Sequence, residues 1–377
     1  MSLKVVMMSN MADAEGVWRT LVAADQTSTF FSTPSWLSPW WCHYGSGRRL
    51  ALVAAFDDTT PVAFAPLMVQ IKLGIPWVSF LGTPQSDYAD FLVNEQRVSR
   101  EEAIHSILTC LVTWVPGALI DLQQIPETSP SVRLVQSWAK KHRLHCTAFA
   151  QDLCPVISLP QTLAAYHGQL KKGFLADIRR GERRLRERGT VRIVDHLTPT
   201  DGDWTTLKDE MTELQSQRMR AKGQIPMWQG PMGSFVKDVL QSSNRDGCLR
   251  LTGLYLNEHL IAYEMCFLHR RSIYSWSRAF ANNYKNTGPG KIALLHVLSE
   301  GIREGRQTLD LLRGEEGYKT FWANDVVRNY RVLLELRASL GSRVAYQWVT
   351  NWHPRLRRST LLINLYHRLK SFRASKR

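Results

Sequence analysis

Two glycines and two lysines lie close together in residues 284–291, whose sequence is Tyr-Lys-Asn-Thr-Gly-Pro-Gly-Lys. Because Gly288 and Gly290 have no Cβ, backbone N–H groups near them can close around an anion at the start of a helix. Lys285 and Lys291 add positive charge at the two ends of the segment. We therefore predict a phosphate-binding loop, in which the N–H groups from Gly288 to Lys291 hold a diphosphate.

Two kinds of phosphate-binding loop fit this segment. Gly288 to Ala293 follows the dinucleotide pattern Gly-x-Gly-x-x-Ala, and Asp310 lies 20 residues after Gly290. In dinucleotide-binding folds, however, the first glycine directly follows a strand, whereas residues 281–287 intervene here. The preceding strand also alternates polar and apolar residues, as a half-exposed strand does. The dinucleotide interpretation is therefore the weaker of the two.

The other pattern is the pyrophosphate loop of GNAT acyltransferases, Gln/Arg-x-x-Gly-x-Gly/Ala, which this loop matches except that Lys285 stands first. Further markers occur in order along most of the chain. They are Phe31-x-Thr33-Pro34-x-Trp36, Trp40-Trp41, Pro66-Leu67, Phe80-Leu81-Gly82, Ser86-Asp87-Tyr88-x-Asp90, a basic helix at 170–188, Asp310-Leu311-Leu312-Arg313-Gly314 and Tyr318-Lys319-x-x-Trp322. Together they resemble the CelD-like (BcsL) acetyltransferase family of bacterial polysaccharide and envelope loci, which is related to the FemABX acyltransferases.

The resemblance implies an α/β (α+β) fold with two tandem GNAT-like lobes, each a mixed, mostly antiparallel sheet flanked by helices. Residues 1–160 would form an N-terminal lobe without a cofactor loop, and residues 161–340 the acyltransferase lobe. Residues 341–377 would form a basic amphipathic tail with a C-terminal helix. The implied co-substrate is acetyl-CoA or another acyl-CoA, and the acceptor a sugar, nucleotide sugar or envelope precursor.

Acyl transfer from a thioester requires a bound donor, a deprotonated acceptor and a proton for the leaving thiolate. Glu264 and Asp310 are candidate bases, because each stands in an apolar strand where burial raises the pKa of a carboxyl group. Each also has a partner for a structural ion pair, namely Arg278 for Glu264 and Arg313 for Asp310. Both alternatives remain open for both acids.

Tyr318 and Lys319 are the other candidate catalytic residues. Lys319 would polarise the thioester carbonyl where negative charge develops, and Tyr318 would protonate the thiolate. Their alternative roles are a core ring and a solvated amine. The strand from Tyr274 to Phe280, which includes Ser277, is expected to pair with the pantetheine arm of the donor.

Acceptor binding is expected near the polar segment Asp87-Tyr88-Ala89-Asp90. Asp87, Tyr88 and Asp90 would hold sugar hydroxyls or an amine between the lobes, although such residues also cap turns. Arg313 and Trp322 complete the candidate substrate-binding residues. We expect no metal site, since the cysteines form no Cys-x-x-Cys pair and no carboxylate accompanies the His-x-x-His-Cys segment at 142–146.

The charge of the chain is unevenly distributed. Of the net charge of +15, residues 171–192 contribute +6 and residues 341–377 contribute +9, so the rest balances to zero. A nucleic-acid-binding protein is more uniformly basic, so nucleic acid is not the expected partner. The basic helix is expected to be a solvated face, a contact for an acidic acceptor or, in a FemABX-like enzyme, a contact for tRNA.

The tail suggests two locations. Leucines and a phenylalanine recur at helical spacing among arginines in residues 352–377, which suits either an anionic membrane surface or packing on the protein itself. No apolar run reaches about 18 residues, and no signal-peptide core precedes residue 16. We therefore expect a cytoplasmic protein, with peripheral attachment to the inner membrane as the alternative.

Periodicity predicts the elements that must position these residues. Predicted strands are 50–56, 61–70, 77–81, 91–93, 118–123, 154–159, 191–194, 249–256, 260–268, 272–280, 308–312 and 330–336, and predicted helices are 101–114, 131–142, 162–188, 203–221, 231–241, 292–304 and 317–323. Three functions remain open: an acyl-CoA-dependent N- or O-acyltransferase, an aminoacyl-tRNA-dependent transferase, and a non-catalytic binding protein.

Overall fold

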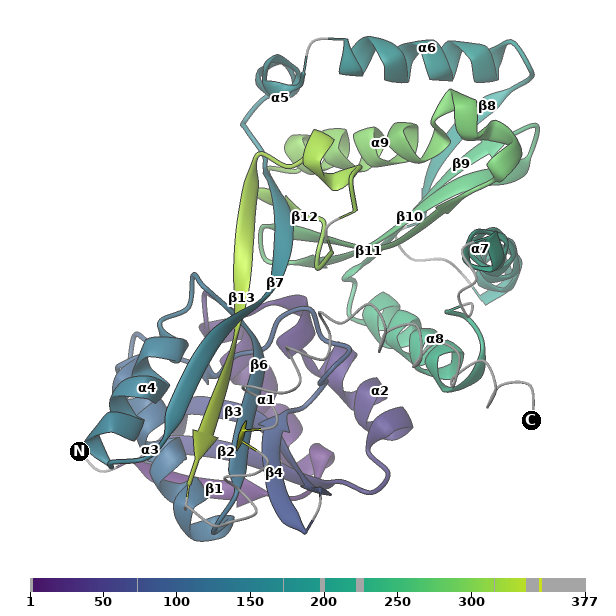
Figure 1. Ribbon diagram of the computed structural model, residues 1–377. Coiled ribbons are helices and arrows are strands. Elements are labelled where there is room, and N and C mark those ends of the chain that lie inside the picture. The colour runs from purple at the N-terminus through teal and green to yellow at the C-terminus, as the bar shows by residue number, and fades with distance from the viewer. Residues whose placement is uncertain are drawn as a thin grey trace.

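The computed structural model describes residues 3–72, 74–171, 173–196, 201–221, 227–314, 316–336 and 346–347. Apart from Tyr346 and Gln347, the predicted basic tail lies outside these residues. The described chain forms two α/β halves, and two long strands run between them (Figure 1). In the described residues, no helix is both long enough and apolar enough to cross a lipid bilayer.

The N-terminal half contains four helices and the first seven strands. The helices are α1 (Met11–Ala24), α2 (Pro34–Tyr44), α3 (Arg100–Trp114) and α4 (Ser131–Lys141), and the strands are β1 (Lys4–Met8), β2 (Arg49–Asp57), β3 (Thr60–Lys72), β4 (Ile75–Phe80), β5 (Leu92–Val93), β6 (Leu119–Pro126) and β7 (Cys146–Ser158). A 3-10 turn, η1, covers Phe30–Ser32.

The C-terminal half follows the same alternation. Its helices are α5 (Leu163–Gln169), α6 (Phe174–Arg186), α7 (Asp201–Ala221), α8 (Gly230–Arg245) and α9 (Pro289–Arg303), and its strands are β8 (Val191–His196), β9 (Leu249–Leu256), β10 (His259–His269), β11 (Ser272–Phe280), β12 (Thr308–Asp310) and β13 (Asp325–Glu335). Two 3-10 turns, η2 (Asn282–Thr287) and η3 (Lys319–Phe321), flank the candidate site residues.

A single mixed sheet runs through both halves. Its strand order is β1-β2-β3-β4-β6-β13-β7-β12-β11-β10-β9-β8, with β5 paired to β3 at one side. The pairs β4–β6 and β11–β12 are parallel and the others are antiparallel. The predicted fold class, a mostly antiparallel mixed sheet flanked by helices, is therefore confirmed.

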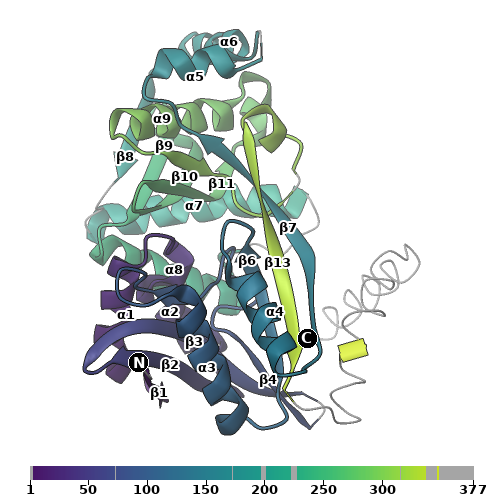
Figure 2. The same ribbon diagram turned by 90° about the vertical axis from the view of Figure 1, so that its left-hand side faces the viewer.

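The strands β7 and β13 connect the halves. They pair along most of their length, from Asp325 opposite Val156 to Leu334 opposite Cys146 (Figure 2). β13, late in the sequence, also pairs with β6 and so belongs to the sheet of the N-terminal half. The chain crosses between the halves twice, first on β7 and again on β13. The domain boundary expected near residue 160 stays a prediction.

Helices cover both faces of the sheet. In the C-terminal half, α9 packs on β9, β10 and β11 from one side, and α7 packs on β10 and β11 from the other. In the N-terminal half, α1 and α3 pack on opposite faces of β2 and β3. One buried apolar cluster includes Trp36 of α2, Phe235 of α8 and Phe267 of β10, so the two halves share a core on this face.

The predicted and observed elements differ in several places. Strand β1 was not predicted, and the helix expected over residues 317–323 is the short 3-10 turn η3. The helix expected over residues 162–188 is broken into α5 and α6 at Gly173, whose φ of 88° a residue with a Cβ rarely adopts. The strand expected from residue 154 begins eight residues earlier, at Cys146. Helices α1 and α2 were not predicted, and α2 contains Pro39, a residue that normally interrupts helices.

Candidate active site

The strand β11 separates from its neighbour β12 after the first three of its nine residues. It pairs with β12 only from Ser272 to Tyr274, while its pairing with β10 continues to Phe280. Since β12 ends at Asp310, which lies opposite Tyr274, β11 beyond Tyr274 has a sheet neighbour on one side only. This open edge lies next to a cleft between the two halves.

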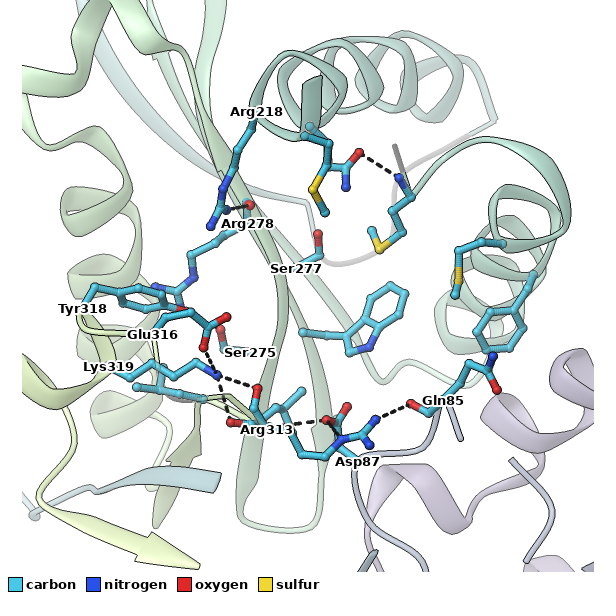
Figure 3. A pocket seen from close by; sticks show the side chains of 18 residues that line it. Gln85, Asp87, Arg218, Ser275, Ser277, Arg278, Arg313, Glu316, Tyr318 and Lys319 are labelled. Atoms are coloured by element: carbon cyan, nitrogen blue, oxygen red, sulfur yellow. Dashed lines mark hydrogen bonds and ion pairs between the residues drawn. The ribbon is translucent and has the colours of Figure 1, made fainter. Parts of the chain in front are cut away.

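The cleft has a volume of about 570 Å³ and is bounded by both halves of the molecule (Figure 3). Gln85 and Asp87 come from the N-terminal half, and the other lining residues come from α7, α8 and the segment before it, β11 and the segment after β12. These others are Gln215, Arg218, Met219, Met227, Met232, Phe235, Ser275, Trp276, Ser277, Arg278, Leu311, Leu312, Arg313, Glu316, Tyr318 and Lys319. The cleft thus brings together Ser277, Arg313, Tyr318, Lys319 and Asp87 from the sequence prediction.

Glu264 forms the ion pair with Arg278 that was one of the two alternatives predicted from the sequence. The side chain is fully buried on β10, its Oε1 lies 3.1 Å from Nη2 of Arg278, and it accepts a hydrogen bond from the Ser275 hydroxyl. Burial raises the pKa of Glu264, and the positive charge of Arg278 opposes that shift. Since Glu264 does not line the cleft, this arrangement suits a residue that orients Arg278.

Tyr318 stacks against the same arginine. The Arg278 guanidinium carbon lies 4.5 Å from the centre of the Tyr318 ring, so the cation is held between the ring and Glu264. Burial raises the pKa of Tyr318 to about 12. The phenol therefore keeps its proton at neutral pH, as a proton donor must.

Lys319 holds the turn after β12. Its Nζ donates to the carbonyl oxygens of Leu312 (3.0 Å) and Arg313 (2.8 Å) and lies 2.9 Å from the Glu316 carboxylate. These three partners occupy all three N–H donors of the ammonium group. The contacts support a positioning role for Lys319, because no N–H is left for a thioester carbonyl in this arrangement.

The turn itself is anchored at both ends. Leu312 has a φ of 60°, and its N–H donates to Oδ1 of Asp310 at 2.7 Å. Arg313 reaches the N-terminal half, where its Nε lies 2.8 Å from Oδ1 of Asp87. Burial raises the pKa of Asp87, and the adjacent Arg313 opposes the shift. This ion pair joins the two halves at the floor of the cleft.

Asp310 faces a second cleft, of about 690 Å³. Its Oδ2 accepts a hydrogen bond from the Tyr88 hydroxyl at 2.7 Å, and both residues line this cavity. Burial raises the pKa of Asp310 to about 7, although the bonds from Tyr88 and the Leu312 N–H favour the charged form. Because Leu311 and Leu312 line the first cleft, the segment that carries Asp310 lies between the two cavities.

The rest of the second cleft is largely polar. Hydroxyl, amide and basic groups predominate among its other lining residues, which are Gln26, Thr27, Ser28, Thr29, Pro126, Thr128, Val156, His269, Arg270, Arg271, Ser272, Tyr274, Gln307, Thr308 and Val327. Burial and the neighbouring Arg270 lower the pKa of His269 to about 4, so the imidazole is neutral at physiological pH. Such a lining suits a ligand with several hydroxyl groups.

The predicted phosphate loop lies outside both clefts. Gly288 occupies the left-handed region (φ 64°) between η2 and α9, as predicted for a glycine. Its N–H, however, donates to Lys285 O (3.1 Å), and that of Lys291 to Gly288 O (2.9 Å). Pro289 has no N–H. Among the described backbone N–H groups from Gly288 to Lys291, that of Gly290 is therefore the one that donates to no backbone carbonyl oxygen.

Helix α6 packs against the loop. A Cβ added at Gly181 of α6 would lie 2.0 Å from the Thr287 carbonyl oxygen, so helix and loop are in direct backbone contact. Lys285 and Lys291 are exposed, and Nζ of Lys291 lies 5.3 Å from the ring centre of Phe174 in α6. The loop therefore offers one amide and two exposed ammonium groups.

Two predicted substrate-binding residues lie away from the clefts. Asp90 accepts the N–H of Phe91 and lies 3.8 Å from the buried Arg100, and burial raises its pKa. Trp322 is buried in the core under α9, with its ring 5.0 Å from that of Phe174. Neither lines a cavity described above, so their proposed roles find no support in the geometry.

Several residues that line the first cleft were not predicted from the sequence. Arg218 of α7 donates to the Arg278 carbonyl oxygen, and no carboxylate of the described chain lies within ion-pair distance of it. Gln85, Gln215 and three methionines also line the cleft. Helix α7 approaches β11 only in the folded chain, so spacing along the sequence carries no signal for these residues.

Metal binding has no support in the described part of the chain, where no group of three or more His, Cys, Asp or Glu side chains is placed to hold an ion.

The comparison with known families concerns the C-terminal half. Residues 172–320 match the sequence model of the family described as "Acetyltransferase (GNAT) domain". This range contains the phosphate loop, the open edge of β11 and the residues Tyr318 and Lys319. No curated protein matches the chain by sequence.

Solved structures of similar fold cover nearly the whole chain. FemX superimposes with a TM-score of 0.59 at 9% identity, over 86% of this chain and 96% of FemX. The C-terminal DUF2156 domain assigned to a lysylphosphatidylglycerol synthetase of Agrobacterium fabrum gives 0.54 at 13% identity, over 90% and 96%. L-PGS from Bacillus licheniformis gives 0.53 at 11% identity, over 90% and 96%. At these identities the likeness to the solved structures is one of fold. The family match covers residues 172–320, less than half of the chain, and supports an acetyltransferase domain of the GNAT type there.

Proposed function

We propose that the protein is an acyltransferase that moves an acyl group from coenzyme A to a nitrogen or oxygen of a small or saccharide acceptor. The observation that carries the proposal is the separation of β11 from β12, which gives the strand an open edge beside a cleft between the halves. The amide groups of a pantetheine arm require such an edge, because they can pair with it as another strand would. The GNAT domain match supports the same chemistry.

The donor would lie along β11, with the thioester near Ser275 and Ser277. The diphosphate would then reach the start of α9, where the Gly290 N–H, the helix dipole and the side chains of Lys285 and Lys291 favour an anion. Such a site would differ from the predicted one, in which several backbone N–H groups hold the diphosphate, because the N–H groups of Gly288 and Lys291 already donate to carbonyl oxygens. Side-chain charge would supply more of the binding than the sequence suggested.

Asp310 is the base that the geometry favours. With a pKa of about 7, its carboxylate can take the proton of an attacking amine or hydroxyl at neutral pH. The acceptor then bonds to the thioester carbonyl carbon, the carbon–sulfur bond breaks, and the thiolate takes a proton from Tyr318. The Tyr318 phenol, oriented beside Arg278, regains a proton from solvent, and the protonated Asp310 releases its proton to solvent.

The acceptor would bind in the second cleft, whose hydroxyl and amide lining suits a sugar. It would meet the thioester at β11, where Tyr274 of the second cleft and Ser275 of the first are adjacent. This agrees with the CelD-like resemblance to polysaccharide and envelope loci, which remains part of the proposal. We place the enzyme in the cytoplasm, with residues 352–377 as the segment that would contact an anionic membrane. That segment lies outside the described residues.

A second candidate is an aminoacyl-tRNA-dependent transferase of the FemABX type. Two observations favour it: the fold is similar to FemX, and the loop retains one free amide where a coenzyme A site is expected to have several. The arginines of α6, Arg179, Arg180, Arg183, Arg184 and Arg186, would then contact the RNA backbone. The two candidates therefore differ in their donor.

A binding experiment tests the donor assignment. We expect coenzyme A to bind the wild-type protein in calorimetry, and Gly290→Glu to weaken this binding at least tenfold. The added carboxylate would repel the diphosphate, and its Cβ would lie 3.3 Å from the Phe280 ring. Gly16→Glu is the matched control, since the exposed Gly16 in α1 has open space around it.

The outcomes separate the candidates. Equal affinities of wild type and Gly290→Glu would remove the loop from the donor site. Binding of aminoacyl-tRNA without coenzyme A, with a steep dependence on salt, would favour the FemABX-type transferase. Binding of neither donor would point to a non-catalytic protein.

A further inference from the structure

The first cleft has an apolar wall that the transfer chemistry does not use. Met219 of α7, Met227 of the segment before α8 and Met232 of α8 line it together with Trp276 and Phe235. All three methionines are half-buried, so each keeps part of its side chain accessible. Figure 3 shows Arg278, Tyr318 and Lys319 together along one side of the cleft. The cavity therefore has a polar side and an apolar side.

The aromatic and the methionine side chains of the apolar wall differ in how freely they can move. Phe235 packs edge-on against Trp36 at 5.0 Å, and Trp276 packs against the same Trp36 at 5.5 Å, so both aromatic residues are locked into the shared core. Methionine side chains are unbranched and polarisable, and they repack readily around apolar ligands of different shape. A wall of this kind suits a flexible hydrocarbon chain better than a rigid, polar ring.

The position of the wall relates it to the donor. Trp276 lies between Ser275 and Ser277, the residues next to which the thioester is proposed to bind. A hydrocarbon chain on the thioester carbonyl would meet the wall within a few bonds. A two-carbon acetyl group would leave the part of the cavity beside the three methionines unfilled.

We infer that the donor carries an acyl chain longer than acetyl, and that the wall of Met219, Met227 and Met232 binds this chain. The inference rests on the proposed function, since it assumes that a coenzyme A thioester occupies the first cleft. It adds the class of acyl group that the enzyme selects, which is a medium-length, unbranched, apolar chain.

Calorimetry with coenzyme A and with its acetyl, butyryl, hexanoyl and octanoyl thioesters tests the inference. We expect affinity to rise about two- to fourfold for each added methylene until the wall is covered, the upper figure being that for full burial. Met219→Trp and Met232→Trp should each fill part of the space. In both variants the rise with chain length should stop earlier, while the affinity for coenzyme A itself stays the same.

Unacylated coenzyme A serves as the internal check on folding, because its thiol is proposed to lie near Ser275 and Ser277 and it has no acyl chain to reach the three methionines. Met11→Trp is the matched control, since Met11 is half-buried in α1 and does not line the cleft. Should Met219→Trp fail to fold, Met219→Ala gives a second test, because removing side-chain contacts should lower the affinity for octanoyl-CoA severalfold relative to coenzyme A.

Two results would overturn the inference in different ways. If coenzyme A binds but all four thioesters bind equally, or if the tryptophan variants leave the chain-length series unchanged, the wall faces another ligand, such as an apolar acceptor. If neither coenzyme A nor any thioester binds, the donor assignment itself fails, and the inference fails with it.

Discussion

Buried carboxyl groups near the clefts differ in what their surroundings let them do. Glu264 is paired with Arg278 and lies behind the strand, whereas Asp310 lines the second cleft and accepts two hydrogen bonds. Both have raised pKa values because burial disfavours the charged form. Asp310 combines a pKa near neutrality with access to a cavity, and this combination distinguishes a candidate base from a structural acid.

Replacement of Asp310 by asparagine should raise stability at pH 8. The pKa of Asp310 is about 7 in the folded protein, whereas that of an aspartate in the unfolded chain is about 3.9. At pH values between these two, the native state therefore binds a proton that the unfolded state has lost. Stability of the wild type therefore falls as pH rises from about 4 to about 7. The asparagine side chain would carry no charge to bury, and the gain should reach up to about 4 kcal/mol at pH 8.

Thermal unfolding from pH 4 to pH 8 measures this effect. The difference in Tm between Asp310→Asn and wild type should grow with pH and level off above pH 7. Asp195→Asn provides a control of opposite sign, because hydrogen bonds from His296 and Thr252 lower the pKa of Asp195. That variant should lose stability at neutral pH. A constant difference for Asp310→Asn at all pH values would show that the carboxyl group is not held neutral.

At the scale of elements, the alternation of polar and apolar residues predicted which segments form strands. It predicted less well which elements pack against one another in the folded chain. The β10–β11 hairpin follows from alternating residues and a short turn, and Gly288 has the left-handed φ that its residue type permits. The amide acceptors at Gly288 and Lys291 depend on the exact turn geometry, and Arg218 reaches β11 only through packing of α7. Sequence spacing contains neither kind of information, so the loop was predicted and its hydrogen bonds were not.

The contact between α6 and η2 gives a prediction at this scale. Gly181→Ala should destabilise the protein by about 1–3 kcal/mol, because its Cβ would lie 2.0 Å from the Thr287 carbonyl oxygen and force two backbones apart. Coenzyme A affinity should fall as well, since the displaced turn precedes Gly290. Thermal unfolding and calorimetry on the same sample measure both effects.

Gly168→Ala in α5 is the matched control. No atom lies within 4 Å of a Cβ at that position, so the variant should equal or slightly exceed the wild type in stability. If Gly181→Ala unfolds at the wild-type temperature, α6 and the loop can separate freely, and the helix does not hold the loop in place.

For the whole molecule, the connections between the halves predict how it unfolds. Arg270 of the C-terminal half donates to Ser28, Gln26 and the carbonyl oxygens of Val22 and Ala23 in the N-terminal half. The paired strands β7 and β13 and the shared core link the halves further. We expect one cooperative unfolding transition, although two-domain proteins often show two.

Arg270→Met tests this expectation by scanning calorimetry. The variant removes four hydrogen bonds between the halves and should lower stability by about 1–3 kcal/mol. The single transition should move to lower temperature without dividing. Two resolved peaks, in the wild type or the variant, would mean that the halves unfold independently despite the common sheet.

The place of β13 in the strand order has a consequence for the newly made chain. β6 and β7 are neighbours of β13, so during translation the N-terminal sheet stays divided until residues 325–335 leave the ribosome. Until then β6 presents an unpaired edge of the kind that joins other chains. The nascent polypeptide would hold this edge open for most of its synthesis, which makes it a natural client for a chaperone.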